Sequence, residues 1–148
     1  MSAQLIIWIL VPAGLSACAF ALAKGGRAER YAALVILANF AVGGVGGLEF
    51  GQNAALIFRL ANDGLAAMAL MSITVIYASP WLGLAMLLYA GQFSLHAFYF
   101  VTGRNVADHL HAVVNNVLFS GILFCLMAGT VMSWRRRTRE ARGLNPSK

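Results

Sequence analysis

The chain has 148 residues and a formal net charge of +6, with 60% hydrophobic and only 11% charged residues. A soluble domain usually has about 25% charged residues, so this chain has too few charges to cover a water-facing surface. The composition excludes an ordinary soluble enzyme and a disordered protein. It predicts an all-α integral membrane bundle, with room for about five transmembrane helices of ~20 residues each.

Apolar runs follow one another along the chain, separated by short polar breaks. We expect a single transmembrane domain over residues 1–134 and a basic cytoplasmic tail over residues 135–148. The predicted spans cover about residues 5–23, 31–48, 54–78, 81–101 and 112–134.

The first apolar run also has features of a processed leader. Leu15-Ser16-Ala17-Cys18 has the pattern of a lipoprotein cleavage box, and Ala21-Leu22-Ala23 that of a signal-peptidase site. Both need a basic residue near the N-terminus, and Met1 to Gln4 contain none. We therefore expect a transmembrane helix here, and we expect Cys18 and Cys125 to be buried apolar residues.

The stretch from Gly64 to Gly103 contains no Lys, Arg, Asp or Glu. As one helix these forty residues would be ~60 Å long, about twice the hydrocarbon thickness of a bilayer. The stretch must therefore fold back on itself, and Ser79-Pro80-Trp81 near its middle marks the break.

Charge predicts the orientation of the spans. Nine of the 11 Lys and Arg residues fall on one side of a five-span bundle, and only Arg59 and Arg104 fall on the other. The positive-inside rule then places the N-terminus outside and the tail in the cytoplasm, as in a bacterial inner membrane. Lipid, and not nucleic acid, is the expected partner of the basic residues. Those of the tail are Arg135, Arg136, Arg137 and Arg139.

Polar residues gather near the predicted outer face. If the hairpins fold at residues 56, 79–80 and 106, several polar residues reach the same depth within the membrane. We expect them to form one cluster, with Gln92 one turn further in. The cluster consists of Glu49, Asp63, His96, Asn115 and Asn116.

Two interpretations of this cluster remain open. An ionisable residue inside a membrane is by default a candidate functional site. Interhelical hydrogen bonds can also simply lock a bundle, each adding about 0.6–2 kcal/mol. As a site, Glu49, Asp63 and His96 could bind a metal ion, or His96 beside Asp63 could carry a proton. The inner half offers only Ser72, Thr74 and Ser79, so we expect no complete proton path.

The remaining polar residues are expected to have ordinary roles. Arg59 and Asp63 are four residues apart and can pair along one helix face. His109 and His111 are predicted to be solvated loop residues, which leaves one histidine within a span and argues against bis-histidine haem. The cofactor, if any, is not identified by the sequence. The chain contains no GxSxG or HExxH motif, so we expect no enzymatic activity.

One further pattern concerns Gly26-Arg-Ala-Glu29-Arg30-Tyr-Ala-Ala33, followed by Asp63 and by Pro80-Trp81…Gly91-Gln92…His96. It resembles a group of small uncharacterised bacterial membrane proteins with an E-R-x-A-A start, one intramembrane Asp and one intramembrane His. The resemblance covers most of residues 26–134 and implies no activity. It favours Asp63 and His96 as the pair to test.

Two hypotheses follow for function. The first is a non-catalytic accessory or structural subunit of a larger membrane complex, or a homo-oligomer. The alternative is a protein that binds or transports a small ligand, a metal ion or a proton at the polar cluster.

Overall fold

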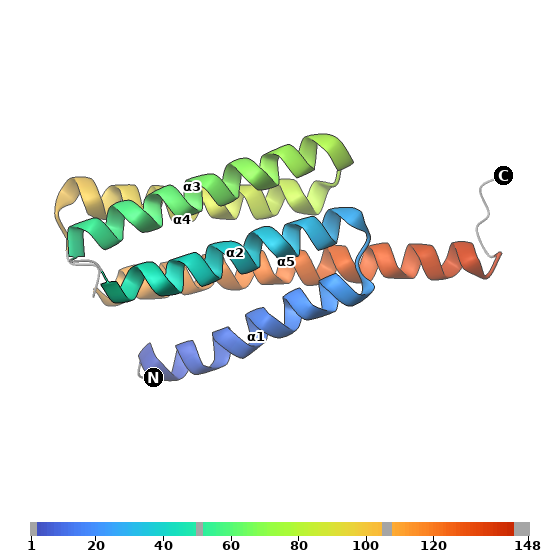
Figure 1. Ribbon diagram of the computed structural model, residues 1–148, viewed down its shortest axis with the longest axis horizontal. Helices are drawn as coiled ribbons and strands as arrows, with labels where there is room; N and C mark the ends of the chain where they lie inside the picture. Colours follow the sequence, from blue (N-terminus) through green and yellow to red (C-terminus); the bar gives the residue numbers. More distant parts are fainter. Residues whose placement is uncertain (1–2, 50–51, 105–107, 144–148) are drawn as a thin grey trace.

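The structure is a computed structural model that describes residues 3–49, 52–104 and 108–143. Within these ranges, side chains are described for residues 9–44, 57–104 and 108–143. The described chain forms five helices, in agreement with the all-α prediction (Figure 1). They are α1 (Ala3–Lys24), α2 (Arg27–Glu49), α3 (Gln52–Tyr77), α4 (Pro80–Thr102) and α5 (His109–Ala141).

The helices pack as an up-and-down bundle in which each helix contacts its neighbour in sequence. Helix α5 closes the arrangement, because it packs against α4 on one side and against α1 on the other. In Figure 1 the α3–α4 hairpin forms one layer, α2 and α5 form the next, and α1 lies on the far side. The polar residues meet between the α3–α4 layer and the layer formed by α2 and α5.

The outer surface is rich in large apolar side chains, unlike that of a soluble protein, and the interior contains buried polar side chains beside an apolar core. Val101 and Phe124 expose 81% and 74% of their area, whereas His96 exposes 3%. The contacts between helices use small side chains such as Ala32 and Ala85, which let the backbones approach closely. Cys18 and Cys125 are buried free thiols, as predicted.

Three helices are long and apolar enough to cross a membrane. These stretches are Ile57–Tyr77, Pro80–Thr102 and His109–Ala141, and Ile9–Lys24 is a shorter apolar helical segment among the described residues. The predicted break within the uncharged stretch is confirmed, because α3 ends at Tyr77 and α4 begins at Pro80. Proline suits this first helical position, where its missing N–H has no partner to lose.

Helix α5 extends well past the other helices at its C-terminal end (Figure 1). With 33 residues it is ~50 Å long, compared with ~30 Å of hydrocarbon. The predicted span ended at residue 134, but the helix continues through Ala141 and includes the first part of the basic tail. The Arg137 guanidinium donates to the Lys24 carbonyl oxygen, which ties the end of α1 to this extension.

A tight contact between α4 and α5 occurs at Gly129. The indole ring of Trp81 lies directly on this residue, so a Cβ atom there would overlap the ring. Trp81 also packs against the buried core of the bundle and cannot move away without opening it. Glycine at this position therefore determines how Trp81 packs.

We expect Gly129→Ala to destabilise the bundle by about 1–3 kcal/mol, the usual cost of overpacking. The measurement is thermal unfolding of the purified protein in detergent. Gly83→Ala is the control, because a Cβ there would meet Thr74 at an ordinary 3.9 Å. Equal unfolding temperatures for the two variants would contradict this account of the Trp81 contact.

Candidate functional site

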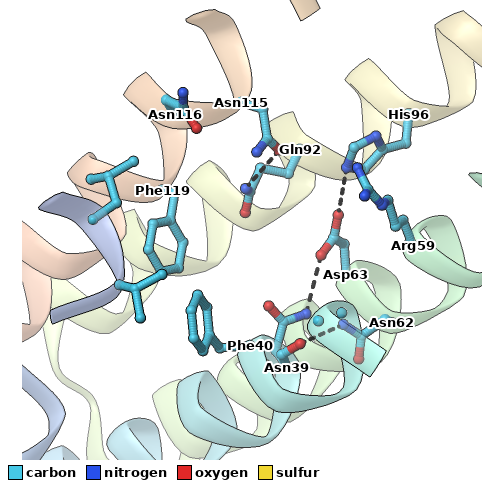
Figure 2. Close-up of a pocket in the computed structure, with 14 residues that line it drawn as sticks. Asn39, Phe40, Arg59, Asn62, Asp63, Gln92, His96, Asn115, Asn116 and Phe119 are labelled. Atoms are coloured by element: carbon cyan, nitrogen blue, oxygen red, sulfur yellow. Dashed lines mark hydrogen bonds and ion pairs between the residues drawn. The ribbon is translucent and has the colours of Figure 1, made fainter. Parts of the chain in front are cut away.

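A partly open cavity of about 410 Å³ lies between the helices and is lined by residues of all five (Figure 2). One wall is apolar and is formed by Leu10, Val11, Phe40 and Phe119. The other wall carries amide, carboxylate, imidazole and guanidinium groups. Its members are Asn39, Arg59, Asn62, Asp63, Gln92, His96, Asn115 and Asn116.

Asp63 and His96 meet at the polar wall, where the sequence analysis placed them together. The Asp63 Oδ2 and His96 Nε2 atoms are 3.2 Å apart, and both side chains are buried. The hairpin turn before Pro80 makes this contact possible, because it brings α3 and α4 side by side. The other carboxylate oxygen, Asp63 Oδ1, accepts a hydrogen bond from Asn39 Nδ2 at 3.1 Å (Figure 2).

Asn39 connects three helices and was not among the predicted cluster. Its Oδ1 atom accepts from the Tyr89 hydroxyl at 3.4 Å, while its backbone carbonyl accepts from Asn62 Nδ2 at 2.8 Å. The Tyr89 bond to Oδ1 orients the Asn39 amide so that its nitrogen points at Asp63. The signal in the sequence was a single asparagine in the middle of an apolar run.

His111 is the main correction to the sequence analysis. It was predicted to be a solvated loop residue, but it is buried in the first turn of α5 and exposes only 3% of its area. His111 Nε2 lies 3.1 Å from His96 Nδ1, and its ring packs edge-on against Tyr99 with centroids 4.7 Å apart. The predicted span began too late, at residue 112, whereas Asp108 caps a helix that begins at His109. His109 itself is exposed.

The statement that only one histidine is buried within a span is therefore wrong. The two imidazole rings of His96 and His111 contact each other, with centroids 5.0 Å apart. This spacing leaves no room for a porphyrin between them. No group of three or more His, Cys, Asp or Glu side chains in the described ranges is placed to hold a metal ion.

Gln92 and Asn115 form a second polar pair on the cavity wall. Gln92 Nε2 donates to Asn115 Oδ1 at 3.1 Å, which joins α4 to α5 (Figure 2). Gln92 exposes 5% of its area, and its Oε1 atom is buried without a hydrogen-bond partner. Asn116 also lines the cavity.

Two expected residues behave differently from the prediction. Arg59 lines the cavity but makes no ion pair with Asp63, whose oxygens are engaged by His96 and Asn39. Within the described side chains, no carboxylate lies within ion-pair distance of Arg59. Glu49 is the last residue of α2, and its side chain lies outside the described part of the chain.

The four arginines expected to face lipid, Arg135, Arg136, Arg137 and Arg139, all lie exposed on the extension of α5. One of them, Arg136, pairs with Glu140 at 3.0 Å. This exposed pair one turn apart contributes little to stability.

Asp108 starts α5 and anchors Tyr99 beside the histidine pair. Its Oδ2 atom accepts from the Tyr99 hydroxyl at 2.9 Å, and its Oδ1 atom accepts from the Leu110 N–H at 3.3 Å. These hydrogen bonds hold the pKa of Asp108 below its ordinary value, and the bond from Tyr99 has the largest effect. The carboxylate therefore supports the helix start at pH values above the ordinary pKa. That support is lost as the pH falls through the lowered pKa.

We expect Tyr99→Phe to raise the pKa of Asp108 towards its ordinary value, because the strongest hydrogen bond to the carboxylate is removed. The chain has only two aspartates, Asp63 and Asp108, so side-chain carboxyl 13C NMR resolves this titration. Tyr77→Phe, at the opposite end of the bundle, is the control and should leave the Asp108 titration in place. An unchanged Asp108 pKa in Tyr99→Phe would contradict the assignment.

Comparison with known proteins adds no assignment, because no family model, curated protein or solved structure matches the chain.

Proposed function

We propose that this chain is a small polytopic membrane protein whose five helices all cross the bilayer. Three helices have the length and apolarity required, and large apolar side chains are exposed on each of the five helices. The Lys and Arg residues concentrate at the end where α1 meets α2 and where α5 extends outwards. By the positive-inside rule, this end is cytoplasmic and the N-terminus is external.

We infer that the protein binds a small amphipathic molecule in the cavity between the helices. The observation that carries this inference is the Gln92 Oε1 atom, which is buried at the cavity wall without a partner. A buried carbonyl without a hydrogen bond costs about 1–3 kcal/mol. A hydrogen-bond donor on a bound molecule would remove this cost, and it would stand beside the amide groups of Asn115 and Asn116.

The residues of the two cavity walls indicate which chemical groups the bound molecule carries. Arg59 brings a positive charge that no described carboxylate neutralises, so it favours a carbonyl or anionic group on the ligand. Phe40 and Phe119 stack with ring centroids 5.9 Å apart and provide a flat apolar surface. The cavity volume lies within the usual range of about 300–1,000 Å³ for small-molecule sites.

The subunit hypothesis would require one apolar face to be reserved for a partner protein. Large apolar side chains are exposed on α3, α4 and α5 alike, for example Leu65, Leu87 and Phe124. This even distribution suits lipid and singles out no partner face within the described chain. We therefore base the proposal on the cavity.

We expect Gly44→Phe to abolish ligand binding by filling the cavity. Gly44 lines the cavity and has no atom within 4 Å of the position its Cβ would take, so a large side chain fits there. The measurement is mass spectrometry of small molecules released from the purified protein by denaturation. A specific compound should fall by at least about tenfold relative to wild type. Val42→Phe, on the exposed face of the same helix, is the control. Equal recovery from both variants would argue against this site.

We expect Asp63→Asn and His96→Gln to lose the same compound while the bundle remains folded. Each of the two side chains makes two interhelical contacts, and one such hydrogen bond costs only about 0.6 kcal/mol on average, so the loss of stability should be about 1 kcal/mol. Unfolding temperature and compound recovery are measured on the same samples. If both variants unfold, the polar cluster is a structural lock and the binding proposal loses its support.

A further inference from the structure

Three buried side chains form a continuous row across three helices. Asp63 of α3, His96 of α4 and His111 of α5 are joined by contacts of 3.2 and 3.1 Å. The row begins at the cavity, which Asp63 and His96 line. It ends in the first turn of α5, next to the cap residue Asp108 and the exposed His109.

The hydrogen positions in this row follow from the chemistry of the three groups. A carboxylate only accepts hydrogen bonds, so His96 must donate to Asp63 through Nε2–H. In a neutral His96 the other nitrogen, Nδ1, is then an acceptor, and His111 must donate to it through Nε2–H. This leaves His111 Nδ1 as the single open lone pair on the two rings.

The same row accommodates one additional proton without breaking a contact. The proton forms an N–H bond at His111 Nδ1, and the former Nε2 proton of His111 crosses to His96 Nδ1. His96 is then an imidazolium between the Asp63 carboxylate and a neutral His111, which now accepts at Nε2. One proton has entered, no electron has moved, and the net charge of the row changes from −1 to zero.

We propose that Asp63, His96 and His111 form a one-proton exchange site that connects the α4–α5 end of the bundle with the cavity. A proton enters at His111, and the Nε2 proton of His96 faces Asp63 at the cavity wall. When a base in the cavity removes this proton, both rings are left neutral with their proton on Nδ1, so the rings must reorient or the transfers must reverse before His111 Nδ1 can take up another proton. The site does not require a resident ligand to hold its proton, so this inference stands apart from the proposed binding function.

The charged groups around the row have opposing effects on the uptake of the additional proton. Helix α3 contributes the positive charge of Arg59, which opposes the additional proton. The Asp63 carboxylate favours it directly, and the Asp108 carboxylate favours it from the start of α5. From α2, the neutral Asn39 holds Asp63 in place, and from α4 the neutral Tyr99 covers His111.

The chain has three histidines, so each ring can be followed individually. The experiment is 15N NMR of the histidine rings in full-length protein in lipid nanodiscs, titrated from about pH 4 to 9. We expect His96 and His111 to change together in one step that corresponds to a single proton. In the protonated state both nitrogens of His96 should have the shift of N–H. Independent steps for the two rings, or no proton uptake in this range, would overturn the proposal.

Two variants make the test specific. Asp63→Asn removes the charge that stabilises the imidazolium, so the joint step should move to lower pH by about 1–3 units. His109→Gln removes the exposed ring and should leave the joint step unchanged. If Asp63→Asn does not fold, wild type and His109→Gln still decide the question. If the joint step is present while the cavity variants release no compound, the exchange site stands and the binding proposal fails.

Discussion

A carboxylate away from water has to be matched by hydrogen bonds or by positive charge, and the arrangement around Asp63 follows from this requirement. Asp63 sits on a helix whose outer face is apolar, and an unmatched charge there would be costly. Its two oxygens are engaged by α2 through Asn39 and by α4 through His96. His96 then needs a partner for its second nitrogen, which α5 provides through His111. One buried charge thus sets the positions of four helices relative to one another.

The polar residues of the cavity wall differ in how far their hydrogen-bonding atoms are engaged within the protein. Asn39, Asp63 and His96 have their polar atoms engaged within the protein. Gln92 has one amide atom engaged and the other buried without a partner. The first group therefore stabilises the bundle whether or not the cavity is occupied, whereas the second gains a hydrogen bond only from an occupant.

The sequence was sufficient for the parts of the fold that depend on composition and chain direction. The absence of charge from Gly64 to Gly103, together with Pro80, predicted the α3–α4 hairpin and hence the meeting of Asp63 with His96. His111 was placed in a loop because the span was predicted to begin at residue 112. The helix begins three residues earlier, at His109, and its cap residue Asp108 was not recognised from the sequence. The Arg59–Asp63 pairing was wrong because tertiary partners displaced a weak contact between neighbours on one helix.

The aromatic residues near the basic end have a consequence for how the bundle responds to its lipid environment. Tyr31 contacts Tyr77, and Trp134 contacts Phe20 and lies beneath Lys24, so two helix pairs, α2–α3 and α1–α5, are joined at this end. Such rings prefer the headgroup region and hold that end at constant depth. If the bundle spans the bilayer as proposed, a change in bilayer thickness is then taken up at the opposite end, where α4 connects to α5. In the proposed orientation, membrane thickness would therefore act on the water access of the first turn of α5, and with it on the rate of the proposed proton exchange at the buried imidazoles.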